Sequence, residues 1–105
     1  MTVERLCCLL LALLGWMPNS AMGQDQAILI GQSAGLTGGQ ARYSQQVKAG
    51  IEAALKAVNA KGGVRGRPLR LITLDDAGRK EKVAANTREL VQQHRVTALV
   101  GYTSG

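Results

Sequence analysis

Small polar residues and glycines that could hold an anion gather in two stretches of the chain. Residues 32–43 carry three glycines among hydroxyl and amide side chains, and residues 101–105 read Gly-Tyr-Thr-Ser-Gly. Glycine lets a ligand approach the backbone, and hydroxyl groups can donate or accept a hydrogen bond. Both stretches therefore suit a small carboxylate ligand. For Thr103 and Ser104, capping of a following helix is an alternative role, and the two roles are compatible.

The residue types that catalysis or metal binding would need are few. Asp75 and Asp76 are adjacent, and two adjacent carboxylates at a strand end point apart and make a poor chelate without further ligands. We expect them to cap the following helix and complement its dipole. His94 is the single histidine, at the end of that helix, where a cationic imidazole is favoured. We therefore predict no catalytic residues, no metal site, no cofactor and no enzymatic activity.

Nucleotide-binding motifs do not fit this chain. Gly31, Gly35 and Gly38 are spaced wrongly for the Gly-x-Gly-x-x-Gly fingerprint of dinucleotide-binding domains. A phosphate loop needs Gly-Lys-Ser/Thr at a helix start, and the sequence holds no such tripeptide. The acidic pair resembles half of a receiver-domain pocket, but the first strand supplies no acid to complete it.

The elements that must position the two polar stretches follow from the apolar periodicity. Short apolar runs predict strands at 27–30, ending at Gly31, at 69–74 and at 96–100, and steps of three and four predict helices over 47–58 and 80–94. This β-α-β-α-β order predicts an α/β fold, a three-layer parallel sheet with right-handed crossovers. With the first strand central, both stretches would lie at the carboxyl edge, where such sheets bind ligands.

The corner between the first helix and the second strand, residues 57–76, organises the chain. Lys61 complements the helix dipole, Gly62 and Gly63 permit left-handed backbone, and Pro68 fits the mouth of a strand.

The first residues have the layout of a secretory signal peptide, predicted over 1–23. An apolar run over 6–17 is too short to span roughly 30 Å of hydrocarbon, and small residues stand at 21 and 23. A short membrane anchor is the less favoured alternative. Cys7 and Cys8 fall within this leader, so we expect no disulfide in the mature part, 24–105, and we expect export to the periplasm.

The net charge of +6 comes from scattered basic residues with few aromatic neighbours. A nucleic-acid surface would cluster its cations and add stacking partners. Solvated helix faces account for this charge better, so we expect no nucleic-acid partner.

Five segments in series resemble the N-terminal part of type I periplasmic solute-binding proteins. They are residues 28–38, 50–54, 58–68 (Val-Asn-Ala-Lys-Gly-Gly-Val-Arg-Gly-Arg-Pro), 74–76 (Leu-Asp-Asp) and 98–101 (Ala-Leu-Val-Gly). The resemblance covers 27–105 and is greatest to the branched-chain amino-acid (Leu/Ile/Val) binding subfamily of ABC-transporter receptors.

The resemblance implies two α/β lobes that close on a small ligand and deliver it to an ABC permease in the membrane. It implies that Tyr102, Thr103 and Ser104 contact the ligand carboxylate and that Tyr43 lines the cleft. The ligand would be an amino acid or another small carboxylate; the residues do not specify which one. An extracellular ligand-sensing domain of a receptor is the alternative function.

The chain is short for this family. We expect it to hold only the first β-α-β-α-β part of lobe 1, as a fragment, and to bind ligand weakly by itself. A ligand is buried when a cleft closes on it from two sides.

Overall fold

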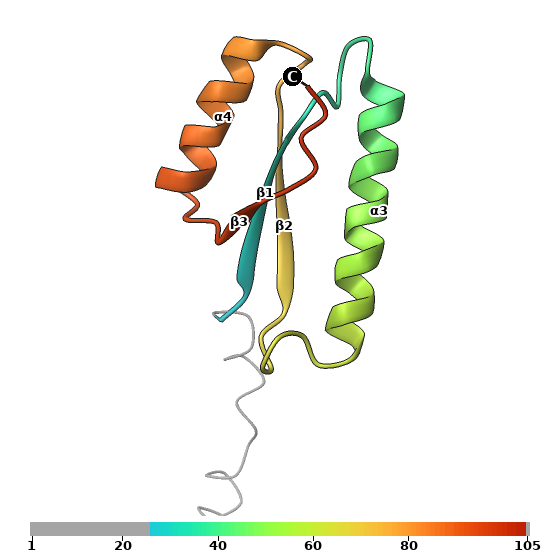
Figure 1. Ribbon diagram of the computed structural model, residues 1–105, viewed down its shortest axis with the longest axis vertical. Helices are drawn as coiled ribbons and strands as arrows, with labels where there is room; N and C mark the ends of the chain where they lie inside the picture. Colours follow the sequence, from blue (N-terminus) through green and yellow to red (C-terminus); the bar gives the residue numbers. More distant parts are fainter. Residues whose placement is uncertain (1–25, 105) are drawn as a thin grey trace, which may run out of the picture.

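The computed structural model describes residues 26–104, whose elements alternate between strand and helix (Figure 1). They are β1 (Ile28–Ala34), α3 (Ala41–Ala60), β2 (Leu69–Asp75), α4 (Lys80–Gln92) and β3 (Ala98–Leu99). The expected β-α-β-α-β order is confirmed. The predicted leader, 1–23, lies outside the described residues and stays a prediction.

The three strands form one parallel sheet in the order β2-β1-β3. β1 and β2 pair along their whole lengths, from Ile28 opposite Leu69 to Ala34 opposite Asp75. The sheet lies between α3 on one side and α4 on the other, which makes three layers (Figure 1). The central place of the first strand and the parallel direction of all three are therefore confirmed. The loops that follow the strands share the carboxyl edge of the sheet.

β1 is longer than the apolar run that predicted it. The expectation that it ends at Gly31 is wrong, because Gln32, Ser33 and Ala34 continue the ladder with β2. Gln32 can be buried in the sheet because both ends of its amide are bonded. Its Nε2 donates to the Gly101 carbonyl oxygen at 2.8 Å, and its Oε1 accepts from the Thr73 hydroxyl at 2.9 Å.

Two other elements are shorter than predicted. α4 ends at Gln92 and not at His94, and Arg95 just beyond it takes a left-handed backbone with φ of 54°. β3 has only the two residues Ala98–Leu99, although the amides of Thr97 and Val100 on either side also bond to β1 carbonyls. α3, in contrast, starts at Ala41, before the first residue of the apolar stripe.

The corner between α3 and β2 has the expected geometry. Gly62 and Gly63 have φ of 103° and 74°, and Pro68 directly precedes β2, where its carbonyl accepts from the Ile28 amide at 2.8 Å. A tight turn between them is closed by two backbone hydrogen bonds that join Val64 and Arg67. The corner thus sets where β2 begins beside β1.

The interior is polar toward the carboxyl edge of the sheet. Among the described residues the fully buried apolar side chains are Ala34 and Leu90, and the fully buried polar residues are Gln32, Ser33, Ser44 and Asp76. None of the polar side chains buried in residues 26–104 lacks a hydrogen-bond partner. Polar groups are buried only where partners are provided, so this edge is organised by specific hydrogen bonds. No helix among the described residues is long and apolar enough to cross a membrane.

Candidate functional site

A hollow of about 220 Å³ opens at the carboxyl edge of the sheet. Its lining comes from all three loops that follow the strands: Gln40 before α3, Gly78 and Lys80 at the start of α4, and Ser104 after β3. This is the edge at which open α/β sheets bind ligands. A cation and a hydroxyl here can hold a small polar molecule.

Asp76 holds the Ser104 segment of this hollow in place. Its carboxylate is fully buried just past the end of β2. One oxygen, Oδ1, accepts from the Ser104 hydroxyl at 2.6 Å and from the Gly78 amide at 2.8 Å; the other, Oδ2, accepts from the Ser33 hydroxyl at 2.7 Å. Three segments that are distant in sequence thus meet on one carboxylate.

Thr103 is held by a second set of bonds on the other side of the same loop. Its hydroxyl accepts from the Gly35 amide at 3.1 Å and lies 2.7 Å from the hydroxyl of Ser44, which is buried in the first turns of α3. Either hydroxyl of that pair can be the donor. Thr103 therefore joins the loop to the residue that follows β1 and to α3, and it does not line the hollow.

The two tyrosines predicted to contact ligand lie apart from this hollow. Tyr43 is in the first turn of α3 and 60% exposed, at the carboxyl edge of the sheet as expected. Tyr102 directs its hydroxyl to the Thr87 hydroxyl of α4 at 2.7 Å. Of the four predicted residues the hollow therefore includes Ser104 alone, and the roles of Tyr43, Tyr102 and Thr103 stay predictions.

Asp75 fastens the loop between β1 and α3. Its Oδ1 accepts from the amides of Leu36, Thr37 and Ala77, and its Oδ2 accepts from the Thr37 hydroxyl at 2.6 Å. The expectation that Asp75 and Asp76 cap α4 is wrong: the N-cap residue is Arg79, and no side chain caps the helix. Both carboxylates instead accept hydrogen bonds from residues outside α4, most of them in the loops around the hollow.

Acid should weaken the hydrogen bonds that Asp75 accepts. The Thr37 hydroxyl, followed by the Ala77 amide, lowers the pKa of Asp75 below its ordinary value. The folded chain therefore binds this proton more weakly than the unfolded chain, so the stabilisation is complete above the ordinary pKa and is lost as pH falls through the lowered one. We expect D75N to be less stable than the parent at neutral pH and to lose less stability below pH about 4.

Urea unfolding followed by circular dichroism between neutral pH and pH about 2 measures this difference. E52Q is the matched control, because it removes a carboxylate from an exposed pair with Lys48 (3.7 Å), which should contribute little. Equal acid sensitivity of D75N and the parent would contradict the prediction.

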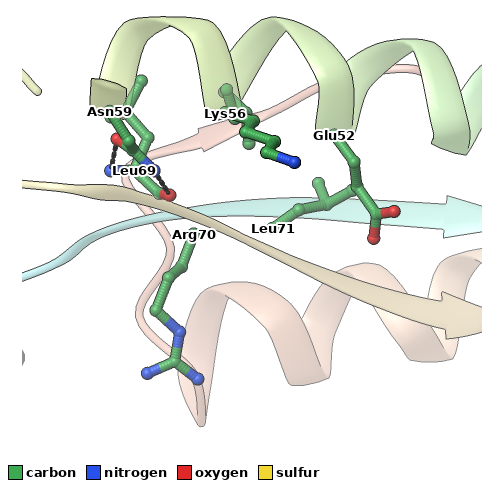
Figure 2. Close-up of a pocket in the computed structure, with 7 residues that line it drawn as sticks. Glu52, Lys56, Asn59, Leu69, Arg70 and Leu71 are labelled. Carbon is green, nitrogen blue, oxygen red and sulfur yellow. Dashed lines mark hydrogen bonds between the residues drawn. The ribbon is translucent and has the colours of Figure 1, made fainter. Parts of the chain in front are cut away.

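A larger hollow, about 290 Å³, lies between α3 and the start of β2 (Figure 2). Figure 2 shows Asn59 at one end of it, with both polar atoms of its amide on Leu69. Its Nδ2 donates to the Leu69 carbonyl at 2.9 Å, and its Oδ1 accepts from the Leu69 amide at 2.8 Å. Asn59 thus substitutes for a neighbouring strand at the edge of β2. This hollow is at the side of the sheet, away from the loops that follow the strands. We therefore interpret it as a structural feature of the contact between α3 and β2.

The metal-ligating residue types stay dispersed in the described part of the chain. No three His, Cys, Asp or Glu side chains gather there in a way that could hold an ion. His94 lies beyond the end of α4, with its Nε2 3.2 Å from a carboxylate oxygen of Glu89. Neither His94 nor its partner Glu89 lines the hollow.

Sequence reasoning did not single out Gly78 and Lys80, which line the hollow, or Asp76, which holds Ser104; it included Gln40 only as part of the stretch 32–43. Gln40 and Lys80 stand at helix starts, where exposed polar residues are ordinary and give no separate signal. Asp76 carried a signal, since it directly follows a strand at the edge where ligands bind. What the sequence does not contain is the direction of its side chain, which the bonds from Ser33 and Ser104 settle.

Comparison with known proteins gives consistent relatives. A family model described as periplasmic binding protein matches residues 27–105. The Leu/Ile/Val-binding protein homolog 2 of Brucella abortus is 48% identical over 50 residues, which is 48% of this chain and 14% of that protein. The Leu/Ile/Val-binding protein BraC3 of Rhizobium johnstonii is 35% identical over 91 residues, which is 87% of this chain and 24% of that protein.

A solved structure agrees with these matches. The branched-chain amino acid transporter substrate binding protein LivJ from Streptococcus pneumoniae, in complex with isoleucine, superposes with a TM-score of 0.68 at 31% identity, over 71% of this chain and 22% of that one. The chain thus spans only about a quarter or less of the length of these relatives.

Proposed function

The chain belongs to the type I periplasmic binding proteins, among relatives that bind Leu/Ile/Val, and on this premise we propose that it acts as part of the substrate-binding component of an ABC transporter. Its ligand would be an amino acid or a related small carboxylate, taken up in the periplasm and passed to a membrane permease. Residues 24–105 would form the N-terminal part of lobe 1, after export directed by residues 1–23. The role is binding without catalysis.

The observation that carries this proposal is the hollow at the carboxyl edge. Lys80 and Ser104 both line it, from the start of α4 and from the segment after β3. A cationic side chain attracts a carboxylate, and a hydroxyl adds a directional hydrogen bond. In this proposal Thr103 fixes the loop through its hydrogen bonds with Gly35 and Ser44. Tyr43 and Tyr102 contribute to the walls of the closed cleft.

A chimera tests the proposal, because the second lobe has to come from a relative. Residues 27–105 would replace the corresponding segment of BraC3 from Rhizobium johnstonii, the relative with the longest of the matches given above. We expect isothermal calorimetry to give micromolar or tighter binding of leucine, isoleucine or valine. K80A should weaken binding at least about tenfold by removing the cation.

K82A is the matched control, two residues further along α4 on an exposed lysine that does not line the hollow. It should leave the affinity unchanged. A chimera that unfolds cooperatively yet gives no heat with any of the three amino acids would overturn the proposal.

A further inference from the structure

Basic residues gather at the amino edge of the sheet, the edge opposite the hollow. Five exposed cations stand in the segments around the starts of β2 and β3: Lys61, Arg65, Arg67, Arg70 and Arg95. None of the five lies within α3 or α4, so the solvated helix faces expected from the sequence do not account for them. Cations that are spread along the sequence thus share one end of the fold, and we call these five residues the amino-edge surface.

The register of the sheet brings the cations of two separate segments together. Arg70 of β2 lies opposite Leu29 of β1. The Leu29 carbonyl accepts from the Thr97 amide at 2.7 Å, two residues after Arg95. Figure 2 shows that the Arg70 side chain points away from α3, and Arg95 follows the end of α4 on the other side of the sheet. Arg70 and Arg95 therefore flank the first residues of β1.

Acidic residues do little to neutralise the amino-edge surface. Residues 61–74 and 90–104 contain no Asp or Glu. Among the described residues the ion pairs are Lys48 with Glu52 and His94 with Glu89, and neither includes one of the five cations. Asp25 precedes the described residues and offsets one of the five charges at most. Like charges held together repel one another, so this surface is complementary to an anionic partner.

We propose that the amino-edge surface binds the anionic phospholipid headgroups of a bilayer. Four of its five residues are arginines, whose guanidinium groups bind phosphate oxygens in pairs. A cluster of this size attracts an anionic membrane, and each cation near the membrane surface contributes about fivefold in affinity. The described aromatic side chains, Tyr43 and Tyr102, lie toward the opposite edge, so the stacking partners of a single-stranded nucleic acid are missing from this surface. The inference goes beyond the proposed function, from which it takes only the nearby membrane.

Vesicle sedimentation with the BraC3 chimera tests this inference. The probes are phosphatidylcholine vesicles with and without about 30% phosphatidylglycerol. At about 0.1 M salt we expect the chimera to bind the anionic vesicles at least about tenfold more tightly, and to release them at about 1 M salt, where charges are screened within about 3 Å. R65Q/R70Q/R95Q should weaken this binding by about tenfold to a hundredfold. Arg67 is kept, because its Nε donates to the Gln26 carbonyl oxygen at 2.7 Å.

Two further variants are matched to this one. R42Q/R79Q/K82Q removes the same charge from the other end of the fold, at the starts of α3 and α4. The seven residues of β2 separate the two ends by about 23 Å, more than the screening length of about 10 Å at 0.1 M salt, so this variant should weaken binding less than about threefold. R65K/R70K/R95K keeps the charge and should bind the anionic vesicles within about threefold of the parent.

Equal losses in the two glutamine variants would mean that net charge alone drives binding, and the inference would be overturned. A chimera that binds leucine but no anionic vesicles would also overturn it, and the proposed function would stand. A chimera that binds these vesicles through the amino-edge surface but binds no branched-chain amino acid would support the inference and overturn the proposed function. Leucine affinity should be the same in R65Q/R70Q/R95Q as in the parent, because the hollow lies at the opposite edge.

Discussion

We expect that replacing Gly63 with alanine leaves most molecules of the protein unfolded at room temperature. A Cβ at this position would overlap the Arg67 carbonyl oxygen, and it would lie 2.7 Å from the carbonyl carbon and 3.2 Å from the Pro68 nitrogen. These are backbone atoms of the turn closed between Val64 and Arg67, so no side chain can rotate to relieve the overlap. We expect a loss of at least about 3 kcal/mol, a large share of the stability of so small a domain.

Gly66 provides a matched control for this substitution. It lies in the same turn with φ of 78°, against 74° for Gly63, and no atom lies within 4 Å of a Cβ built on it. G66A should therefore cost only the strain of a left-handed alanine, about 1–2 kcal/mol. Urea unfolding of both variants measures the difference, and equal losses would show that overlap with Arg67 is not what Gly63 avoids.

The corner around Gly63 is also the part of the fold that the sequence predicts best. Paired glycines after a helix and a proline before an apolar run are local signals, and local sterics decide them. The alternation of strands and helices is equally local, since it follows from the periodicity of apolar residues. The parallel sheet then follows from the crossover rule, because strands joined by helices of this length have few other arrangements.

Distant partners decide the features that sequence reasoning got wrong. Gln32 and Ser33 looked like the start of a loop because a polar residue in a strand core is costly. They are strand residues because Gly101 and Asp76 bond to them from 69 and 43 positions away. Nothing within a few residues of β1 announces those partners.

The same distinction between local signals and distant partners applies to the residues of the site. That Ser104 belongs to the carboxyl edge follows from topology, which the sequence reveals. Thr103 pairs with Ser44, and Tyr102 pairs with Thr87. Which hydroxyl pairs with which neighbour depends on differences in atomic position of a few ångströms, which the sequence does not contain. Adjacent carboxylates were expected to point apart, and Asp75 and Asp76 do accept from separate sets of donors, but loops and not α4 supply them.

Leu90 should be the most sensitive apolar side chain of the described residues. It is fully buried on the inner face of α4, and its Cδ2 lies 3.2 Å from where a Cβ of Gly31 would be. Val96 and Leu99 approach the same point at 3.1 and 3.2 Å. Leu90 thus packs α4 directly against the backbone of β1 at Gly31, which has no side chain. L90A should cost about 3 kcal/mol, from lost apolar burial and from the cavity left behind.

Val91 is the neighbouring control, since it is 50% exposed on the same helix and V91A should change stability by no more than about 0.5 kcal/mol. L90M, which nearly conserves volume, should cost less than about 1.5 kcal/mol. Because α4 begins at Lys80, loosening it also displaces one wall of the hollow. In the chimera, L90A should therefore weaken leucine binding as well as lower the melting temperature. A melting temperature that falls equally in V91A would mean that α4 is not held through Leu90.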